Sequence, residues 1–172
     1  MRDQRHPAGA EKQREPSKRE LKEELVRALE AQLETLERAH RATREAATHE
    51  EAKPENDKDT RALEQSYVAR GQALRVEEVR AGLADVRAWS ADPFEAGRSA
   101  ALGALVLVEE DERRKLVLIA PYGGGIALGG GAVQVVTTSS PLAKALFGKR
   151  EGDVCETKIG DRTRELEIVA VR

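Results

Sequence analysis

Two long segments of helical periodicity, joined by a short acidic turn, constrain the fold of this chain more than any other feature. In the first segment, which begins at Ser17, apolar residues recur at helical spacing and neither Gly nor Pro interrupts them before Pro54. The second segment runs from about Asp59 to Trp89. Each has about 30 residues and is therefore about 45 Å long as a helix. Arms of equal length joined by a short turn predict an antiparallel coiled-coil hairpin over residues 17–89, with its tip near residues 50–59.

The first helix has a clear start signal, and the second contains two weak points. Ser17 stands three residues before Glu20, which is the spacing of a capping box. Gly71 and Gly82 each destabilise the second helix by about 1 kcal/mol relative to Ala. Neither is expected to end so long a run.

The seam between the two helices is expected to change along the hairpin. Away from the tip it uses large apolar residues, namely Leu21, Leu25, Leu29, Val79, Leu83 and Val86. Near the tip it uses alanine, namely Ala39, Ala42, Ala46, Ala62, Ala69 and Ala73. Because small residues let helices approach closely, the distal half should be slender. Such a rod fits entry into a narrow passage, but the pattern is equally typical of a coiled coil that serves as a spacer or dimerisation arm.

The tip itself is acidic. The stretch EEAKPENDKDT, residues 50–60, holds five carboxylates in eleven residues. Pro54 lies among them and disfavours a continuous helix. These acids are a candidate functional site, but a solvated turn in which Asp57 or Asp59 caps the second helix explains them as well.

Composition excludes several classes of function. The net charge is −2 and aromatic residues make up 3% of 172 residues, so neither bulk attraction to nucleic acid or membrane nor one large core is expected. The sequence contains neither a run of about 18 apolar residues nor a recognisable export signal. Cys155 is the only cysteine, which excludes an intrachain disulfide and favours a cytoplasmic protein. Residues 1–16 hold almost nothing to bury, and we expect a disordered tail.

After a linker at residues 90–100, which contains Pro and Gly, the pattern changes from helical to β-type. The expected strands are Leu102–Glu109, Lys115–Ala120, Val133–Thr137, Val154–Lys158 and Arg164–Val171. Ser140 as N-cap, Pro141 at the first helical position and Gly148 as the stop predict one short helix among them. One helix on a mostly antiparallel sheet makes residues 101–172 an α+β domain.

Two further features do not favour a ligand site. The glycine runs at 123–125 and 129–131 are not followed by the Gly-Lys-Ser/Thr of a phosphate-binding loop, so we expect a flexible loop between strands. His40 and His49 lack the cysteines, or a second histidine at i+4, that a metal site would need.

The stretch from Val136 to Asp153, VTTSSPLAKALFGKREGD, resembles the C-terminal signature of the bacterial Gre transcript-cleavage factors. In that family a strand runs into Ser-Pro-Leu/Ile, a short helix, Gly-Lys, and then Gly-Asp before the next strand. The final RELEIVAVR is similar to the closing strand of the family. The resemblance covers about 70 residues, and it implies an FKBP-like C-terminal domain preceded by an N-terminal coiled coil. This is the architecture that the helical pattern predicts independently.

The resemblance also implies a partner and a mode of action. Such a factor docks on bacterial RNA polymerase through its C-terminal domain, where Ser140, Pro141, Leu142 and Lys149 are the expected polymerase-binding residues. It inserts the hairpin into the secondary channel, so that the tip reaches the active centre and stimulates cleavage of backtracked RNA. It is not an enzyme by itself, because the tip completes an active site that belongs to the polymerase. Inhibitory Gre paralogues share the fold without promoting cleavage, and they remain the alternative.

The expected chemistry at the tip depends on carboxylates. Mg²⁺ prefers oxygen ligands and keeps several waters, so one or two acids can help to hold an ion that the polymerase shares. No cofactor is expected to bind stably to the chain alone. The family pattern has an Asp and a Glu three residues apart, a spacing that does not transfer cleanly to this sequence. Asp57 and Asp59 are the expected pair, and Glu55 is the next candidate.

A basic strip lies behind the tip in the expected hairpin. Arg38, Arg41 and Arg44 recur on the first helix, with Arg61 and Arg70 on the returning arm. Our hypothesis is that the strip contacts the 3′ end of the nascent RNA or the channel wall. Solvated helix faces are the alternative.

Overall fold

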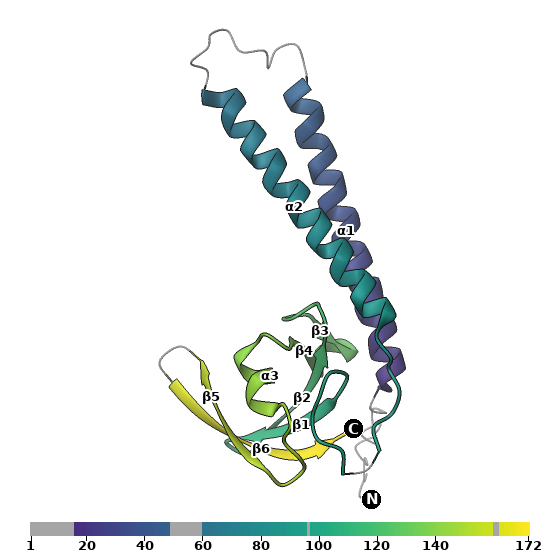
Figure 1. Ribbon diagram of the computed structural model, residues 1–172, viewed down its shortest axis with the longest axis vertical. Coiled ribbons are helices and arrows are strands. Elements are labelled where there is room, and N and C mark those ends of the chain that lie inside the picture. Colours follow the sequence, from purple (N-terminus) through teal and green to yellow (C-terminus); the bar gives the residue numbers. More distant parts are fainter. Residues whose placement is uncertain (1–15, 49–59, 96, 160–161) are drawn as a thin grey trace, which may run out of the picture.

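Two long antiparallel helices stand on a small six-stranded domain in the computed structural model, which describes residues 16–48, 60–95, 97–159 and 162–172 (Figure 1). The helices are α1, Lys18–Thr48, and α2, Thr60–Ala88. The rest comprises β1, Leu105–Glu110; β2, Arg113–Ala120; β3, Ala127–Leu128; the 3₁₀ helix η2, Gly129–Gly131; β4, Val133–Thr137; α3, Pro141–Leu146; β5, Val154–Ile159; and β6, Arg162–Val171. This arrangement confirms the predicted fold class, a helical hairpin followed by a small α+β domain with one short helix. Within the described residues no helix is both long and apolar enough to cross a membrane.

The start of α1 is the predicted capping box. The backbone N–H of Glu20 donates to Ser17 Oγ at 3.2 Å, and the N–H of Ser17 donates to Glu20 Oε2 at 2.7 Å. Two N–H groups that the first turn leaves without helical partners are thereby satisfied. The capping prediction is therefore confirmed.

The seam near the sheet is also as predicted. All six of its large apolar residues, from Leu21 to Val86, are buried. Ion pairs between the helices flank the seam, with 2.6 Å between Arg87 and Glu30 and 2.7 Å between Arg80 and Glu37.

The seam predicted near the tip is wrong for α1. Ala39, Ala42 and Ala46 are exposed, whereas Leu36, His40 and Thr43 are partly buried. The buried and partly buried stripe of α1 consists of Leu29, Leu33, Leu36, His40 and Thr43. Its successive residues are alternately four and three positions apart, so they form one continuous stripe, which the alanines do not share. Of the alanines assigned to α2, Ala69 and Ala73 are partly buried, and the side chain of Ala62 is outside the described set. The expected close approach of small residues is replaced by a polar seam, along which the helices diverge (Figure 1).

The sheet has the order β3-β4-β2-β1-β6-β5, and every neighbouring pair is antiparallel except β2 and β4. All five strands expected from the sequence are present. At the turn between β1 and β2, Asp111 and Glu112 have φ values of 49° and 61°, the left-handed pair that a tight two-residue turn requires. The sequence did not predict β3 or η2. Residues 127–131 are therefore ordered elements rather than the flexible loop expected from their glycines.

The two faces of the sheet pack against different helices. One face, which includes Leu105, Leu118 and Val135, joins the base of the hairpin in a single hydrophobic cluster. The other face, which includes Val106, Val117 and Ile168, packs against α3. Because successive residues of a strand point to opposite faces, β1 and β2 contribute to both clusters. Cys155 is buried in the cluster on the α3 side, as expected for a small hydrophobe, and burial raises the pKa of its thiol.

Polar contacts tie the base of the hairpin to the domain. The ammonium of Lys18 donates to the carbonyl of Gly103 at 2.9 Å and lies 3.8 Å from the centre of the Phe94 ring. Burial, reinforced by the nearby charge of Arg98, lowers the pKa of Lys18 from 10.5 to about 8. Glu24 on α1 accepts a hydrogen bond from the backbone N–H of Gly129 at 2.9 Å. The hairpin base is thus fastened to the glycine segment as well as to the hydrophobic core.

Candidate functional site

The sequence places candidate sites at the hairpin tip, behind the tip and on the C-terminal domain. The tip acids Glu55, Asp57 and Asp59 lie outside the described residues. The structure describes the two helices on either side, which end at Thr48 and begin at Thr60. No group of three or more His, Cys, Asp or Glu side chains within the described part of the chain is placed to hold a metal ion.

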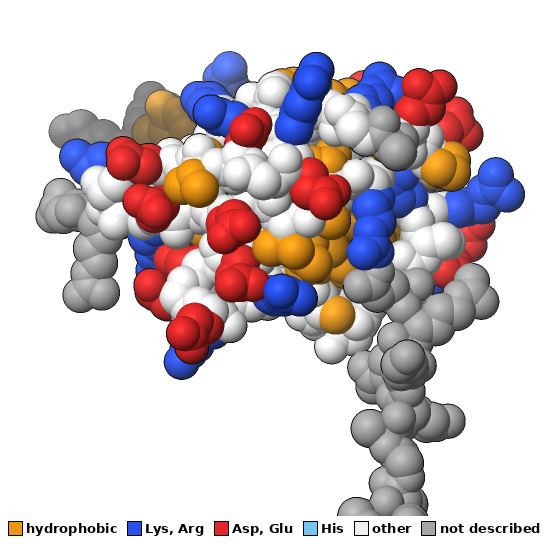
Figure 2. All heavy atoms as spheres, turned by 90° about the horizontal axis from the view of Figure 1, so that it is seen from below, with side chains coloured by type: hydrophobic (Ala, Val, Ile, Leu, Met, Phe, Trp, Pro, Cys, Tyr) orange, Lys and Arg blue, Asp and Glu red, His pale blue; other side chains and the backbone are white. Residues whose placement is uncertain are grey.

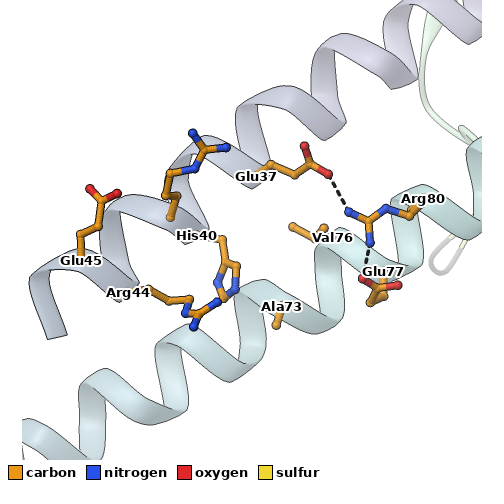
Figure 3. Close-up of a pocket in the computed structure, with 9 residues that line it drawn as sticks. Glu37, His40, Arg44, Glu45, Ala73, Val76, Glu77 and Arg80 are labelled. Carbon is orange, nitrogen blue, oxygen red and sulfur yellow. Dashed lines mark hydrogen bonds and ion pairs between the residues drawn. The ribbon is translucent and has the colours of Figure 1, made fainter. Parts of the chain in front are cut away.

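The three arginines of the proposed strip have different surroundings on α1. Arg38 is exposed and paired with Glu34 at 2.8 Å. Arg41 and Arg44 line an open cleft between α1 and α2 together with His40, which Figure 3 shows between the two helices. On the α2 side Arg80 bridges Glu37 and Glu77.

The interhelical cleft is balanced in charge. Its arginines are Arg41, Arg44 and Arg80, and its carboxylates are Glu37, Glu45 and Glu77. A balanced set produces no strong field for an anion. Two buried polar atoms between the helices nevertheless lack hydrogen-bond partners. They are His40 Nδ1 on α1 and Gln72 Oε1 on α2. This part of the seam is held together less well than the apolar part below it.

The C-terminal domain carries a groove of about 770 Å³ on the α3 side of the sheet. Its lining includes the buried apolar side chains of Val108, Val117, Val136 and Leu166. A volume of this size is within the range of sites that hold a ligand or a partner's side chains. We call this site the α3 groove.

The start of α3 forms one wall of the α3 groove, and its sequence explains its position. Ser140 Oγ accepts a hydrogen bond from the N–H of Ala143 at 3.1 Å, and Pro141 occupies the first turn, as predicted. Ser140, Pro141 and Leu142 all line the groove. Lys149, the fourth expected polymerase-binding residue, follows Gly148 beyond the other end of α3 and does not line it.

Charged side chains surround the opposite side of the groove. Glu110 lies 2.9 Å from Lys115 and 3.3 Å from Arg164, and the hydrogen bond from Lys115 is the main cause of its lowered pKa. Lys158 adds a further positive charge, so the charged lining has a net charge of +2. Thr157 is only 4% exposed, and its hydroxyl has no partner. These residues come from four different strands, β1, β2, β5 and β6, and no local pattern in the sequence could have grouped them.

The end of the molecule opposite the tip offers no comparable charge bias. Acidic and basic side chains are interspersed there around a patch of hydrophobic side chains (Figure 2). Such a mixed surface produces no large field of one sign.

Comparison with known proteins decides the family. Residues 97–172 match the family model described as the C-terminal domain of the transcription elongation factors GreA and GreB. The transcription elongation factor GreA of Thioalkalivibrio sulfidiphilus is 33% identical in an alignment of 150 positions that covers 84% of this chain and 90% of that protein. This chain belongs to the GreA/GreB family. GreA of Alkalilimnicola ehrlichii is also similar, with 32% identity over 157 residues, covering 88% of this chain and 90% of that protein.

Solved structures similar to this GreA/GreB family member include GreA factor homolog 1 of Thermus thermophilus. It is 25% identical with a TM-score of 0.38, and the match covers 86% of this chain and 94% of that one. The GreA/GreB elongation factor of Nitrosomonas europaea is 19% identical with a TM-score of 0.35, over 66% of this chain and 94% of that one. The family resemblance read from residues 136–153 is therefore confirmed by the family model and by the relatives over most of the chain.

Proposed function

We propose that this GreA/GreB family member binds bacterial RNA polymerase through the α3 groove. The hairpin then enters the secondary channel, and the tip carboxylates stimulate Mg²⁺-dependent cleavage of backtracked RNA. The observation that carries the docking step is the position of Ser140, Pro141 and Leu142. The three residues that the family motif marks for the polymerase form a wall of the α3 groove.

The chemistry of the α3 groove defines what it would accept. Its buried apolar lining favours an apolar ridge of the partner, since water leaves both surfaces on contact. The net charge of +2 around it favours acidic side chains beside that ridge. We therefore expect the polymerase segment in the groove to be amphipathic, with an apolar stripe next to carboxylates.

The hairpin is long enough to hold its tip far from the C-terminal domain. Helix α2 has 29 residues and is about 43 Å long, and most of it projects beyond the sheet (Figure 1). At the tip, Asp57 and Asp59 would contribute carboxylate oxygens to a Mg²⁺ ion that the polymerase also holds, with Glu55 assisting. In this proposal the chain is an accessory factor, and the polymerase carries out the hydrolysis.

One sequence feature favours a second candidate function. The spacing of the tip acids departs from the family pair, so the chain could occupy the channel as a regulator without stimulating cleavage. The two functions share the docking step and differ only in the chemistry at the tip.

The first experiment measures RNA cleavage in a backtracked bacterial elongation complex. Wild type is compared with Asp57→Asn and Asp59→Asn, and Asp85→Asn is the matched control because it makes the same change at an exposed site on α2. Stimulation by wild type and Asp85→Asn, lost in the tip variants while binding persists, supports the cleavage function. Binding without stimulation by wild type would establish the regulator instead.

A second experiment tests the docking groove separately. Lys158→Glu reverses a charge in the groove lining and should weaken polymerase binding about tenfold at low salt, with a smaller effect at high salt. Lys144→Glu is the matched control, because Lys144 is exposed on α3 and does not line the groove. Equal losses in both variants would count against the groove as the docking site.

A further inference from the structure

Gly82 and Tyr122 bring the hairpin and the C-terminal domain together well above the base of the rod. Tyr122 follows β2, and its ring lies against α2 at Gly82, which is buried. Its hydroxyl lies 3.4 Å from Glu78 Oε1, one helical turn farther toward the tip. Glu78 also forms a salt bridge with Arg75, with 2.7 Å between Arg75 Nη1 and Glu78 Oε2. Burial raises the pKa of the Tyr122 phenol, so its proton is retained and can be shared with Glu78.

Gly82 is the residue that makes this contact geometrically possible. A Cβ added there would lie well under 3.0 Å from three atoms of the Tyr122 ring, closer than Cβ atoms come to their neighbours in real structures. These atoms belong to the rigid ring near its attachment point, so they cannot move aside as the end of a flexible side chain can. Gly71 on the same helix differs, because an added Cβ would have no atom within 4 Å. Only one of the two glycines that weaken α2 therefore has a packing reason.

We propose that the ring of Tyr122 seated on Gly82 is a positioning contact, which sets the direction in which the hairpin leaves the C-terminal domain. The contacts lower down, from Leu25, Lys18 and Glu24 to the sheet and its loops, hold the base of the rod. A rod held only at its base can pivot about it. The contact at Gly82 removes this freedom.

A small displacement of α2 at Gly82 becomes a large displacement at the far end of the helix. Gly82 lies about 9 Å along α2 from its end at Ala88, whereas the start of the helix at Thr60 lies about 42 Å from that end. To bring the added Cβ to an ordinary contact distance, the ring or the helix must retreat by about 1 Å. Pivoting about the base would then move the far end by about 5 Å.

The consequence for catalysis rests on the proposed function. A catalytic group displaced by even 1 Å can lose about 100-fold in rate, so the tip carboxylates would miss the reacting centre. The α3 groove is on the other face of the sheet, and its affinity for the polymerase should be unaffected. The contact would thus determine the rate at saturation and leave binding unchanged.

The first test measures hairpin direction in the free, full-length chain. Spin labels are attached through Ala39→Cys on α1 and Glu151→Cys after α3, both exposed positions, and the distance between them is measured by pulsed electron paramagnetic resonance. Wild type and Gly71→Ala should give the same narrow distribution. Gly82→Ala should shift or broaden it by about 2 Å, because Ala39 lies near the level of Glu78, only about 15 Å from the end of α2 at Ala88. A broad distribution in wild type, or no change in Gly82→Ala, would overturn the inference.

A double variant separates positioning from general damage to the helix. Tyr122→Ala removes the ring and should broaden the distance distribution by itself. Adding Gly82→Ala to that background should cause no further change, because the clashing ring is gone. Additive effects of the two substitutions would show that Gly82 acts through something other than Tyr122 and would overturn the assignment.

The second test uses the backtracked elongation complex. Gly82→Ala should lower the cleavage rate at saturating factor about 100-fold, and the half-saturating concentration should stay within about threefold of that of wild type. Gly71→Ala should match wild type in both. If wild type does not stimulate cleavage, the proposed function fails, and the distance measurement still decides the inference. A Gly82→Ala variant with a shifted hairpin and full cleavage would refute the catalytic consequence alone.

Discussion

The lower and upper halves of the hairpin use opposite chemistry between the same two helices. In the lower half the seam is apolar and buried, and it merges with the core of the sheet. In the upper half the seam contains His40, Thr43 and Gln72, and large apolar side chains of α2 face solvent instead, with Tyr67 63% and Leu74 64% exposed. The comparison teaches that the fold anchors the rod at one end. Because the upper half buries less apolar surface, we expect it to contribute less to stability than the lower half.

The largest expected effect comes from the lower seam. Leu25→Ala removes a fully buried side chain from the shared cluster and should lower the free energy of unfolding by about 3–4 kcal/mol. Leu74→Ala, on the exposed face of the upper half, should change it by less than about 0.5 kcal/mol. Urea denaturation followed by circular dichroism measures both, and similar losses would show that the two halves are equally important to the fold.

The base of the hairpin should also respond to pH, through Lys18. In the folded chain the pKa of Lys18 is lowered from 10.5 to about 8, and burial is the main cause. Between these values the unfolded chain binds the proton more tightly, so stability should rise as pH increases from about 8 to about 10. After allowance for solvent screening the rise should be on the order of 1–2 kcal/mol.

Lys18→Met isolates this contribution from other groups that titrate in the same range. Tyr122 opposes it at the upper end, because its raised pKa makes stability fall once the unfolded phenol ionises. The difference in stability between wild type and Lys18→Met should therefore change across pH 8–10. A constant difference would mean that Lys18 does not titrate on folding.

The upper seam should become more stable when it is made apolar. His40→Leu removes a buried nitrogen that has no partner and should increase protection of nearby amides on α1 by about 1 kcal/mol in hydrogen exchange. Ala39→Leu is the matched control, because Ala39 is exposed and lies outside the observed seam. If Ala39→Leu instead separated the helices and lowered protection, the alanine seam would be correct after all.

The smallest effects should come from surface ion pairs. Arg38→Ala breaks the exposed pair with Glu34 in the upper half and should destabilise the chain by about 0.3–0.5 kcal/mol at low salt, and less at high salt. Arg87→Ala, which breaks the exposed pair with Glu30 near the base, should cost a similarly small amount. A large loss in either variant would mean that ion pairs, rather than the seam, distinguish the two halves.

The elements that the sequence predicted correctly are those set by neighbours along the chain. The capping box of Ser17 and Glu20, the cap and proline at the start of α3, and the period-two strands depend on residues within a few positions of each other. The seam near the tip was missed on α1 because Ala39, Ala42 and Ala46 fit a helical repeat as well as the true stripe does. Only packing against α2 distinguishes the two.

The α3 groove shows the same division between local and distant information. Ser140, Pro141 and Leu142 form a contiguous motif, so the sequence could mark them. Lys158, Arg164 and Thr157 became part of the groove only through the order of the strands. Gly82 was visible in the sequence only as a weak point of a helix. Its partner Tyr122 lies 40 residues away along the chain.

By itself, the sequence determined the two long helices, α3 and five of the six strands, the caps of α1 and α3, the family and the acidic composition of the tip. These depend on short-range periodicity and on contiguous motifs. Tertiary structure alone decided how the rod is aimed, which stripe of α1 faces α2, and which side chains surround the groove. The physical reason is that these features arise where surfaces from distant segments meet. There, the fit of a ring to a glycine or of a strand to its neighbour depends on three-dimensional shape, which no local pattern encodes.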